Sequence, residues 1–437
     1  MKVLVCGGNG FIGAALVRGL RAAGHDVVRG LRRPREPGDI AIDFSKDTDA
    51  AVWLPRLAGI DAVVNAVGII AERPGVRFID LHQRAPIALF EACAKAGVRR
   101  VVQISALGAD GGDTEYFRTK YAADQFLARQ PVEWQILRPS LVHGRDGASA
   151  AAFRLLASLP VIALPSLPRT AWFQPVHLDD LVAAVQIVID PHTPPHQTIA
   201  CVGATRHSFR EMIAAYRDAM GLGPALWMKV PGVVMGLAAR VTRFIPGVPL
   251  NPETWRMLRQ GNAADAGDFT RLLGRRPRGL AEFIEPAAAE LLRARALAGW
   301  QLPMLRGAVA AVWIITALVT IFVFPEEESL ALLARAGLTG TLATLALYGA
   351  AAFDLALGLA TLLYPRRITW LAQIALMLGY TAIIAVALPE FLAHPFGPIL
   401  KNLPILAILV VLLSADTRCG PRESSRRPRP SSSPSPA

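Results

Sequence analysis

The sequence predicts an α/β domain built on a doubly wound parallel sheet, followed by a bundle of four membrane-spanning helices. Short apolar strands alternate with helical patterns in the first half of the 437 residues, which is typical of a parallel sheet with helices on both faces. A cluster of glycines follows the first strand directly. Four apolar stretches lie towards the C-terminus, and the 53% of hydrophobic residues is high for a soluble protein.

The first strand, the glycine cluster and the first helix together predict a nucleotide site. Val3 to Val5 is an apolar strand, and Phe11 to Leu20 has apolar residues at helical spacing. A turn without side chains lets the backbone approach a pyrophosphate, which the unpaired N–H groups of a helix N-terminus bind. A glycine triplet alone is a weak signal, since an ordinary strand–turn–helix corner also contains glycine. The residues expected to bind the cofactor here are Gly7, Asn9, Gly10, Phe11, Ile12 and Gly13.

The end of the second expected strand, Asp26 to Leu31, indicates which dinucleotide binds. A site for NAD usually places an acidic residue here, which accepts a hydrogen bond from the ribose 2′-hydroxyl. This chain has Arg32, which can pair with a 2′-phosphate, so NADP is favoured, with NAD as the alternative. A solvated arginine at a strand end is the other interpretation of Arg32. Ile40 to Phe44 predicts a third strand, on which Asp43 would accept from the adenine amino group.

Three further expected strands end in small or polar residues. They span Ala62 to Ala66, Arg100 to Ile104 and Glu133 to Arg138, and a helix is expected over Leu81 to Ala96. Ligands bind at the carboxyl ends of parallel strands, so the residues that follow these strands should line the cofactor. They are Asn65, Ala66, Val67 and Gly68 at the end of the first of these strands and Pro139 after the last.

Tyr116 and Lys120 are the residues that predict chemistry. Their i, i+4 spacing places both on one face of a helix expected between the last two of these strands. An ammonium group beside a phenol favours the phenolate, so we expect the pKa of Tyr116 to be lowered towards the working range. Tyr116 would then exchange a proton with a carbinol while hydride moves, and Lys120 would also hold the nicotinamide ribose.

These motifs together resemble the short-chain dehydrogenase/reductase superfamily, in its extended or atypical branch, over roughly residues 1–290. The glycine turn, with Cys6 where threonine is common, the segment 65–68, the pair of Tyr116 and Lys120, and the segments 137–144 and 174–181 each resemble a family motif. The resemblance implies a Rossmann-type sheet with a small substrate lobe and an NAD(P) cofactor.

The resemblance also implies a serine or threonine after the fifth strand that hydrogen-bonds the substrate oxygen. Either Ser105 fills that role, or the aligned residue is Ala106 and a donor worth about 2–4 kcal/mol in the transition state is absent. Several atypical members keep the nucleotide site for structural or regulatory use. The chain is similar to one of them, the nucleotide-binding accessory subunit of respiratory complex I, and to its bacterial relatives.

The expected domain boundaries are residues 1–200 for the nucleotide-binding domain and 201–297 for the substrate lobe. Within the lobe, Ser208 and Glu211 predict a capping box at the start of a helix. Further helices are expected over Asn251 to Gln260 and Gly279 to Ala296.

The polar residues around His177 have two interpretations. A histidine beside two aspartates can be a catalytic relay, but a structural histidine is favoured. Asp179 and Asp180 are expected to cap a helix over Leu181 to Ile189.

Residues 303–415 predict a membrane domain, since its apolar stretches lack a polar face and a span takes about 20 helical residues. The expected spans are Ala308 to Phe324, Leu338 to Leu363, Trp370 to Leu388 and the shorter Leu403 to Ser414. A soluble four-helix bundle is the alternative. Asp354 lies inside the second span, where a carboxylate is a functional-site hypothesis. It would pair with Lys401, accept from Tyr380, face a polar cavity or quinone headgroup, or make a helix-packing hydrogen bond.

The glycine-rich stretch around Asp354 and the proline-rich turn from His394 to Pro404 resemble the DoxX-like membrane family. The tail, residues 416–437, is rich in arginine, serine and proline and is expected to be disordered.

The distribution of arginine predicts how the chain sits in a membrane. The net charge is +12, and arginines precede the first expected span, separate the second from the third and follow the fourth. With four spans these segments share one side, which the positive-inside tendency makes cytoplasmic. No signal peptide is expected at Met1, so the nucleotide domain and the C-terminus would lie in the cytoplasm and the protein would be a multi-pass protein of the inner membrane. No nucleic-acid partner is expected, because no basic region is interleaved with aromatic residues.

Three functions remain in consideration. The first is a membrane-anchored NADP-dependent oxidoreductase or isomerase that uses Tyr116, Lys120 and Ser105 on a small-molecule or lipid substrate. The second is a nucleotide-binding sensor or assembly factor at the membrane, without turnover. The third is a nucleotide-sugar epimerase. The four cysteines show no metal-ligand spacing and no disulfide framework, so no metal is expected, and the sequence defines no oligomeric state.

Overall fold

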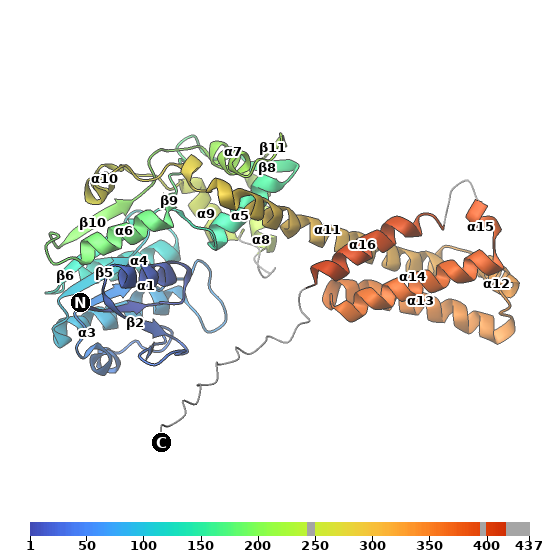
Figure 1. Cartoon of the computed structure of the whole chain (residues 1–437), viewed down its shortest axis with the longest axis horizontal. Coiled ribbons are helices and arrows are strands. Elements are labelled where there is room, and N and C mark those ends of the chain that lie inside the picture. The colour runs from blue at the N-terminus through green and yellow to red at the C-terminus, as the bar shows by residue number, and fades with distance from the viewer. Residues whose placement is uncertain (243–249, 394–398, 417–437) are drawn as a thin grey trace, which may run out of the picture. The chain divides into compact units, whose positions relative to one another are not determined.

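The structure is a computed structural model that describes residues 1–242, 250–393 and 399–416 (Figure 1). The chain divides into two compact units, residues 1–297 and 298–437. Most of the expected tail, residues 417–437, and part of the expected turn at 394–404 lie outside the described residues.

The core of the first unit is a seven-stranded parallel sheet with the order β10-β6-β5-β4-β1-β2-β3. The strands are β1 (Lys2–Cys6), β2 (Asp26–Leu31), β3 (Ile40–Ala41), β4 (Ala62–Asn65), β5 (Arg100–Ile104), β6 (Glu133–Pro139) and β10 (Gln197–Cys201). The chain winds outward from β1 in both directions, so the topological switch point lies between β1 and β4. This arrangement confirms the predicted doubly wound sheet.

Helices cover both faces of the sheet, because alternate residues of each strand point to opposite faces. In β1, Leu4 and Cys6 belong to one buried cluster and Val3 and Val5 to the other. One face packs against α1 (Phe11–Ala22), α6 (Leu178–Ile189) and α10 (Gly267–Leu273), and the other against α2 (Ala50–Trp53), α3 (Ala85–Ala96) and α4 (Glu115–Leu127). Figure 1 shows α1 and α6 side by side on their face.

Three elements of this sheet domain differ from the expectations. β3 ends at Ala41, because the backbone turns at Asp43, whose carbonyl accepts from the amides of Lys46 and Asp47. The helix expected from Leu81 begins two residues earlier as a π-helical turn, Ile79–Arg84, and continues as α3. β10 was not predicted as a strand, although it forms the edge of the sheet beside β6.

The small lobe is built around a third buried cluster. Its elements are α5 (Ala148–Ser158), β8 (Val161–Pro165), α7 (Phe209–Ala219), β11 (Leu226–Val230), α8 (Gly232–Thr242) and α9 (Pro252–Gln260), and short strands β7 (Val142–His143) and β9 (Val176–His177) pair beside it. The predicted capping box of Ser208 and Glu211 is present at the start of α7. The helix expected over Gly279 to Ala296 is wrong in its bounds, since a 3₁₀ turn at Leu280–Glu282 precedes α11 (Pro286–Phe322).

The start of α6 corrects another expectation. The helix begins at Leu178, and its N-cap is His177, whose Nδ1 accepts from the Asp179 amide at 3.3 Å. Asp180 is fully buried and pairs with Arg275 at 2.6 Å instead of capping the helix. The aspartates are therefore not the caps, and His177 has the structural position that the sequence favoured.

The second unit contains the apolar helices of the predicted membrane domain. Among the described residues, three helices are long and apolar enough to cross a membrane: α11, α13 (Gly340–Leu363) and α14 (Arg367–Ala387). α16 (Asn402–Ala415) has 14 residues, fewer than the roughly 20 that a span takes, so the predicted count of four is not confirmed. Two shorter helices, α12 (Glu326–Arg335) and α15 (Glu390–Ala393), complete the unit.

Buried polar side chains connect the long helices of this unit. The indole of Trp313 donates to the Gln373 amide oxygen at 2.7 Å, and the Gln373 amide nitrogen donates to the Thr361 hydroxyl at 3.0 Å. Asp354 is 6% exposed and faces Tyr380, whereas Lys401 is exposed. Within the described part of the chain, the Oδ1 atom of the Asp354 carboxyl group has no hydrogen-bond partner.

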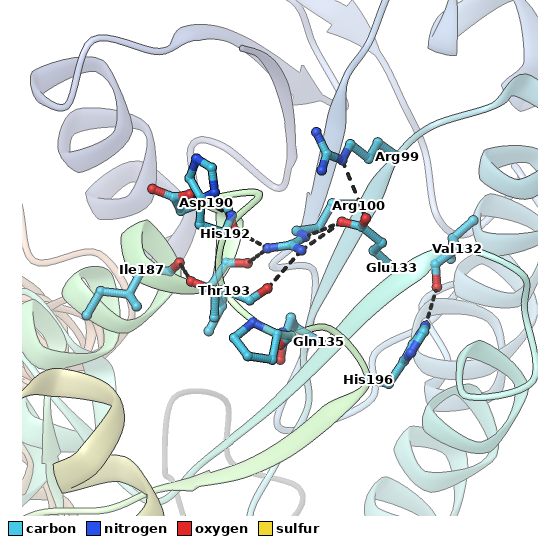
Figure 2. Close-up of polar contacts among 12 residues, drawn as sticks. Arg99, Arg100, Val132, Glu133, Gln135, Ile187, Asp190, His192, Thr193 and His196 are labelled. Atoms are coloured by element: carbon cyan, nitrogen blue, oxygen red, sulfur yellow. Dashed lines mark hydrogen bonds and ion pairs between the residues drawn. The ribbon is translucent and has the colours of Figure 1, made fainter.

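Arg100 fixes the amino-terminal end of the sheet, opposite to the strand ends that carry the site (Figure 2). Its side chain is 2% exposed and pairs with Glu133 at 2.7 Å. The same guanidinium donates to the carbonyls of Val188 at 2.9 Å and Thr193 at 3.0 Å, and to that of Asp190. One buried cation therefore ties β5 to β6, to the last turn of α6 and to the segment that follows it.

We predict that Arg100→Ala lowers the free energy of opening of β5 and β6 by about 3 kcal/mol, because it leaves buried carbonyls without their donor and Glu133 with only the exposed Arg99 as a partner. Hydrogen exchange of the β5 and β6 amides measures this loss. Arg99→Ala is the matched control, since Arg99 contacts the same carboxylate at 3.5 Å but is 56% exposed. Equal protection in the two variants would contradict the role given to Arg100.

Candidate active site

The glycine turn brings the N-terminus of α1 directly over the end of β1. Gly7 has a φ of +78°, and its carbonyl accepts from the Gly10 amide at 2.8 Å. A Cβ atom at Gly13 would overlap the Gly7 carbonyl oxygen, so only glycine allows this packing. Gly10 is the N-cap of α1 without a side-chain cap, and the first turn has no acidic residue. The turn therefore offers backbone N–H groups to an anion, and it fits a pyrophosphate.

Two arginines near the end of β2 differ in their ion pairs and in their exposure. Arg29 is ion-paired with Asp39 at 2.8 Å. The side chain of Arg32 is 63% exposed and lies 3.9 Å from Asp43. Burial opposes ionisation of Asp43, but hydrogen bonds from Ser45 and the charge of Arg32 outweigh it and lower its pKa. Arg32 is thus the arginine that can still receive a phosphate group.

The segment after β4 lies against the glycine turn. A Cβ atom at Gly7 would lie 3.1 Å from Val67 and 3.3 Å from the Ala66 carbonyl, so this backbone lines the same crevice. Asn65 is 1% exposed; its amide nitrogen donates to Gln103 at 2.8 Å and its oxygen accepts from the Val67 amide at 3.2 Å. Among the residues expected to contact the cofactor, Asn65 therefore holds the segment in place with its own side chain.

The remaining predicted cofactor residues lie around the same strand ends. Pro139 ends β6, and its carbonyl accepts from the Leu107 amide at 2.9 Å. The Phe11 ring packs against Gly144 and Gly147, where an added Cβ would lie 2.8 Å from it. Ile12 packs on the second core cluster, while Asn9 is exposed.

Tyr116 and Lys120 lie on one face of α4, as their spacing predicted. The Lys120 ammonium lies 5.9 Å from the centre of the Tyr116 ring and donates to the Ile104 carbonyl at 3.1 Å. Burial lowers the pKa of Lys120 to about 8 and raises that of Tyr116 to about 12. The expected lowering of the Tyr116 pKa is therefore not found, because burial outweighs a lysine at this distance.

Ser105 is buried and donates its hydroxyl proton to Asp124 at 2.7 Å. Asp124 also pairs with Arg138 at 3.2 Å. Burial raises the pKa of Asp124, although Ser105, Arg138 and Lys120 favour its charged form. The Ser105 hydroxyl is thus directed into the protein by a carboxylate.

Two residues of this cluster were missed by the sequence reasoning. Asp124 follows Lys120 by four residues on the same face of α4, so its position continues the spacing of Tyr116 and Lys120 and was detectable. His82 lies 5.2 Å from the Tyr116 ring in an edge contact, and its Nε2 accepts from the Ile69 amide at 3.0 Å. Burial and Lys120 lower the pKa of His82, which keeps it neutral. No sequence pattern distinguishes it.

Two stretches of the chain match known protein families. Residues 7–154 match a family described as NAD(P)H-binding, and residues 310–410 match the DoxX-like family. The chain therefore joins an NAD(P)-binding domain of the epimerase and reductase type to a DoxX-like domain, as the motifs predicted.

Several curated proteins are similar to part of this chain. Epimerase family protein SDR39U1 from Homo sapiens is 27% identical over 54% of this chain and 85% of its own length. Sterol demethylase protein B from Methylococcus capsulatus is 26% identical over 63% of this chain and 93% of its own. The 2-alkyl-3-oxoalkanoate reductase from Stenotrophomonas maltophilia is 33% identical over 33% of this chain and 52% of its own. These relatives support an NAD(P)-dependent oxidoreductase or epimerase.

Solved structures share the fold at low sequence identity. UDP-N-acetylglucosamine 4-epimerase from Bacillus cereus has a TM-score of 0.50 at 14% identity, covering 67% of this chain and 96% of its own. NADPH-dependent quinone oxidoreductase QOR2 from Escherichia coli, complexed with NADPH, has a TM-score of 0.51 at 16% identity, covering 64% and 98%. Together they confirm the Rossmann-like architecture.

We predict that Gly13→Ala weakens nucleotide binding by about 100-fold or more, because the new methyl group forces α1 away from the turn that holds the pyrophosphate. Fluorescence titration of the full-length protein with NADPH measures the affinity, with circular dichroism to verify that the sheet domain is folded. Gly111→Ala is the control, since no atom lies within 4 Å of a Cβ added there. A folded Gly13→Ala protein with unchanged affinity would place the nucleotide elsewhere.

Proposed function

We propose that the protein is a membrane-anchored, NADP-dependent oxidoreductase that acts on a hydrophobic, membrane-associated carbonyl or alcohol. The observation that carries the proposal is the Tyr116 and Lys120 pair on α4, next to the crevice of an NAD(P)-binding sheet. The DoxX-like match and the three long apolar helices support a substrate that dissolves in the membrane. Sterol demethylase protein B and the 2-alkyl-3-oxoalkanoate reductase, two of the relatives, are named for substrates of hydrophobic character.

The mechanism follows from the protonation states of the two side chains. When bound, the reduced nicotinamide supplies a hydride to the carbonyl carbon. Tyr116 donates its hydroxyl proton to the carbonyl oxygen, so the product is an alcohol; its pKa of about 12 keeps that proton in place at neutral pH. Lys120, with a pKa of about 8, is charged at neutral pH and stabilises the tyrosinate that forms. Solvent then returns a proton to Tyr116.

We assign Arg32 to the 2′-phosphate and Asp43 to the adenine end of NADP. Arg32 suits this role because its ion pair with Asp43 is long, at 3.9 Å, and Asp43 also accepts a hydrogen bond from the Ser45 hydroxyl. A guanidinium that keeps free donors recognises a phosphate with two parallel hydrogen bonds.

We predict that Arg32→Ala weakens NADPH binding by about 10- to 100-fold and leaves NADH binding unchanged, because only NADPH carries the phosphate that Arg32 contacts. Titration of both nucleotides measures the ratio of affinities. Arg33→Ala, which removes the neighbouring exposed arginine, is the matched control. An unchanged preference in Arg32→Ala would refute the assignment and favour NAD.

We predict that Tyr116→Phe lowers the rate of NADPH-dependent turnover by about 10²- to 10⁴-fold while NADPH binding is retained, since the proton donor alone is removed. The measurement is NADPH oxidation by the full-length protein in lipid nanodiscs supplied with cellular lipid extract. Tyr121→Phe, another tyrosine of α4, is the control. Turnover in Tyr116→Phe equal to that of the unaltered protein would remove Tyr116 from the mechanism.

One observation favours a second function, a nucleotide-binding sensor or assembly factor without turnover. The Ser105 hydroxyl proton is held by Asp124, so the substrate oxygen would lack the donor that the resemblance implies. Tight NADPH binding without turnover by any lipid fraction would support this function over the first.

We infer that the nucleotide domain lies on the cytoplasmic side of the inner membrane. The arginines of α11 that precede its apolar stretch, and Arg366 and Arg367 at the start of α14, support this orientation by the positive-inside tendency. NADP is also available on that side.

A further inference from the structure

Helix α8 of the small lobe exposes apolar side chains, whereas an ordinary surface helix exposes polar ones. Val233, Val234, Leu237 and Val241 are 85%, 53%, 61% and 58% exposed, respectively. At about 100° per residue these four side chains occupy one arc of roughly 100° on the helix surface. The outward face of α8 is therefore apolar.

The inward face of α8 is formed by small residues. A Cβ atom at Gly236 would lie 3.4 Å from the Trp255 indole of α9, and one at Gly232 would lie 3.7 Å from it. Ala239 on the same side is fully buried. Figure 1 shows α8 beside α9. The glycines allow close packing on α9, while the large apolar side chains point away from the protein core. Such an exposed apolar face marks an interaction site.

Two basic residues lie close to this face in the chain. Lys229, at the end of β11, and Arg240, beside Val241 in α8, are both exposed. In β11, which leads into α8, Leu226 and Met228 are 67% and 52% exposed. Apolar residues with lysine and arginine at the margin are typical of helices that lie in the interface of an anionic bilayer.

The chain itself brings a bilayer close to the small lobe. The first unit ends at Leu297, and the first apolar stretch begins at Ala308, so only residues 298–307 separate them. At about 1.5 Å per residue of helix, such a segment spans roughly 15 Å. A bilayer that holds the apolar stretch of α11 is thus separated from the end of the first unit by only these ten residues of chain.

We propose that α8 is an interfacial helix that inserts its valine and leucine face into the surface of an anionic phospholipid bilayer. Lys229 and Arg240 contact the headgroups. α8 packs on α9, where Gln260 donates to Asp113 at 2.8 Å, three residues before Tyr116. Insertion of α8 therefore brings α9 and the segment before Tyr116 close to the lipid surface, from which a hydrophobic substrate would reach the site. The insertion itself requires no catalysis by Tyr116.

The test places a fluorescent label on α8 of the full-length protein. Leu237→Cys carries an environment-sensitive probe in a Cys419→Ser background, and Cys6, Cys93 and Cys201 are buried and do not compete for the label. Val52→Cys is the matched control, because Val52 is a 40% exposed apolar residue of α2, which packs on the sheet and not in the small lobe. Each protein is placed in nanodiscs of phosphatidylcholine and phosphatidylglycerol that hold one copy.

The proposal expects a blue-shifted probe at position 237 that lipids brominated on their acyl chains quench at least about twofold more than the probe at position 52. Iodide in the water should quench position 52 more strongly. Charge reversal by Lys229→Glu with Arg240→Glu should reduce lipid quenching at position 237.

Equal quenching at both positions would overturn the proposal, as would protection of position 237 only in discs with two copies, which would make α8 a contact between chains. NADPH binding, measured on the same samples, is expected to be unaffected, so failure here is distinct from failure of the Tyr116 mechanism.

Discussion

The close approach of α1 to the end of β1 is the constraint on which the rest of the first unit depends. Gly13 packs directly against the Gly7 carbonyl, and Gly7 itself adopts a positive φ of +78°. Because of this approach, the free amides of α1 point over the switch point between β1 and β4. The backbone after β4 closes the same crevice from the other side, held by Asn65. The N-terminus of α1, which fits an anion, therefore packs on the end of β1 with no side chain between them.

Chemistry beside this crevice depends on buried charges that balance one another. Lys120 and Asp124 of α4 and Arg138 of β6 are largely buried together. Asp124 favours the charged form of Lys120, and Lys120 and Arg138 favour the charged form of Asp124. Among the described residues, no charged neighbour offsets the effect of burial on Tyr116, whose pKa is raised to about 12. This residue is therefore suited to donate a proton rather than to accept one. In the same cluster, Asp124 accepts the hydroxyl proton of Ser105 at 2.7 Å. In the reaction that we propose, this arrangement suits Tyr116 to the reduction of a carbonyl and leaves the Ser105 proton engaged by Asp124.

Strand ends and helix spacing were predictable from the sequence because they depend on local patterns. β2 and β5 have the expected bounds, and Tyr116 and Lys120 share a face of α4 as their spacing requires. β10 was missed, because an edge strand of mixed polarity has no distinctive pattern and its place is decided by pairing with β6. The partner of Ser105 and the position of His82 depend on packing between distant segments. The pKa of Tyr116 was expected to shift in the wrong direction, since sequence spacing contains no information on burial.

The function that we propose requires hydride to pass between NADP in the crevice and a lipid-soluble substrate, with Tyr116 as the proton donor. The most direct measurement supplies NADPH deuterated at the transferable C4 position to the full-length protein in nanodiscs with lipid extract, followed by mass spectrometry of the lipid fraction. The account predicts deuterium in a lipid alcohol, and none with Tyr116→Phe. Tight NADPH binding without deuterium in any lipid would contradict it and make the protein a nucleotide-binding sensor.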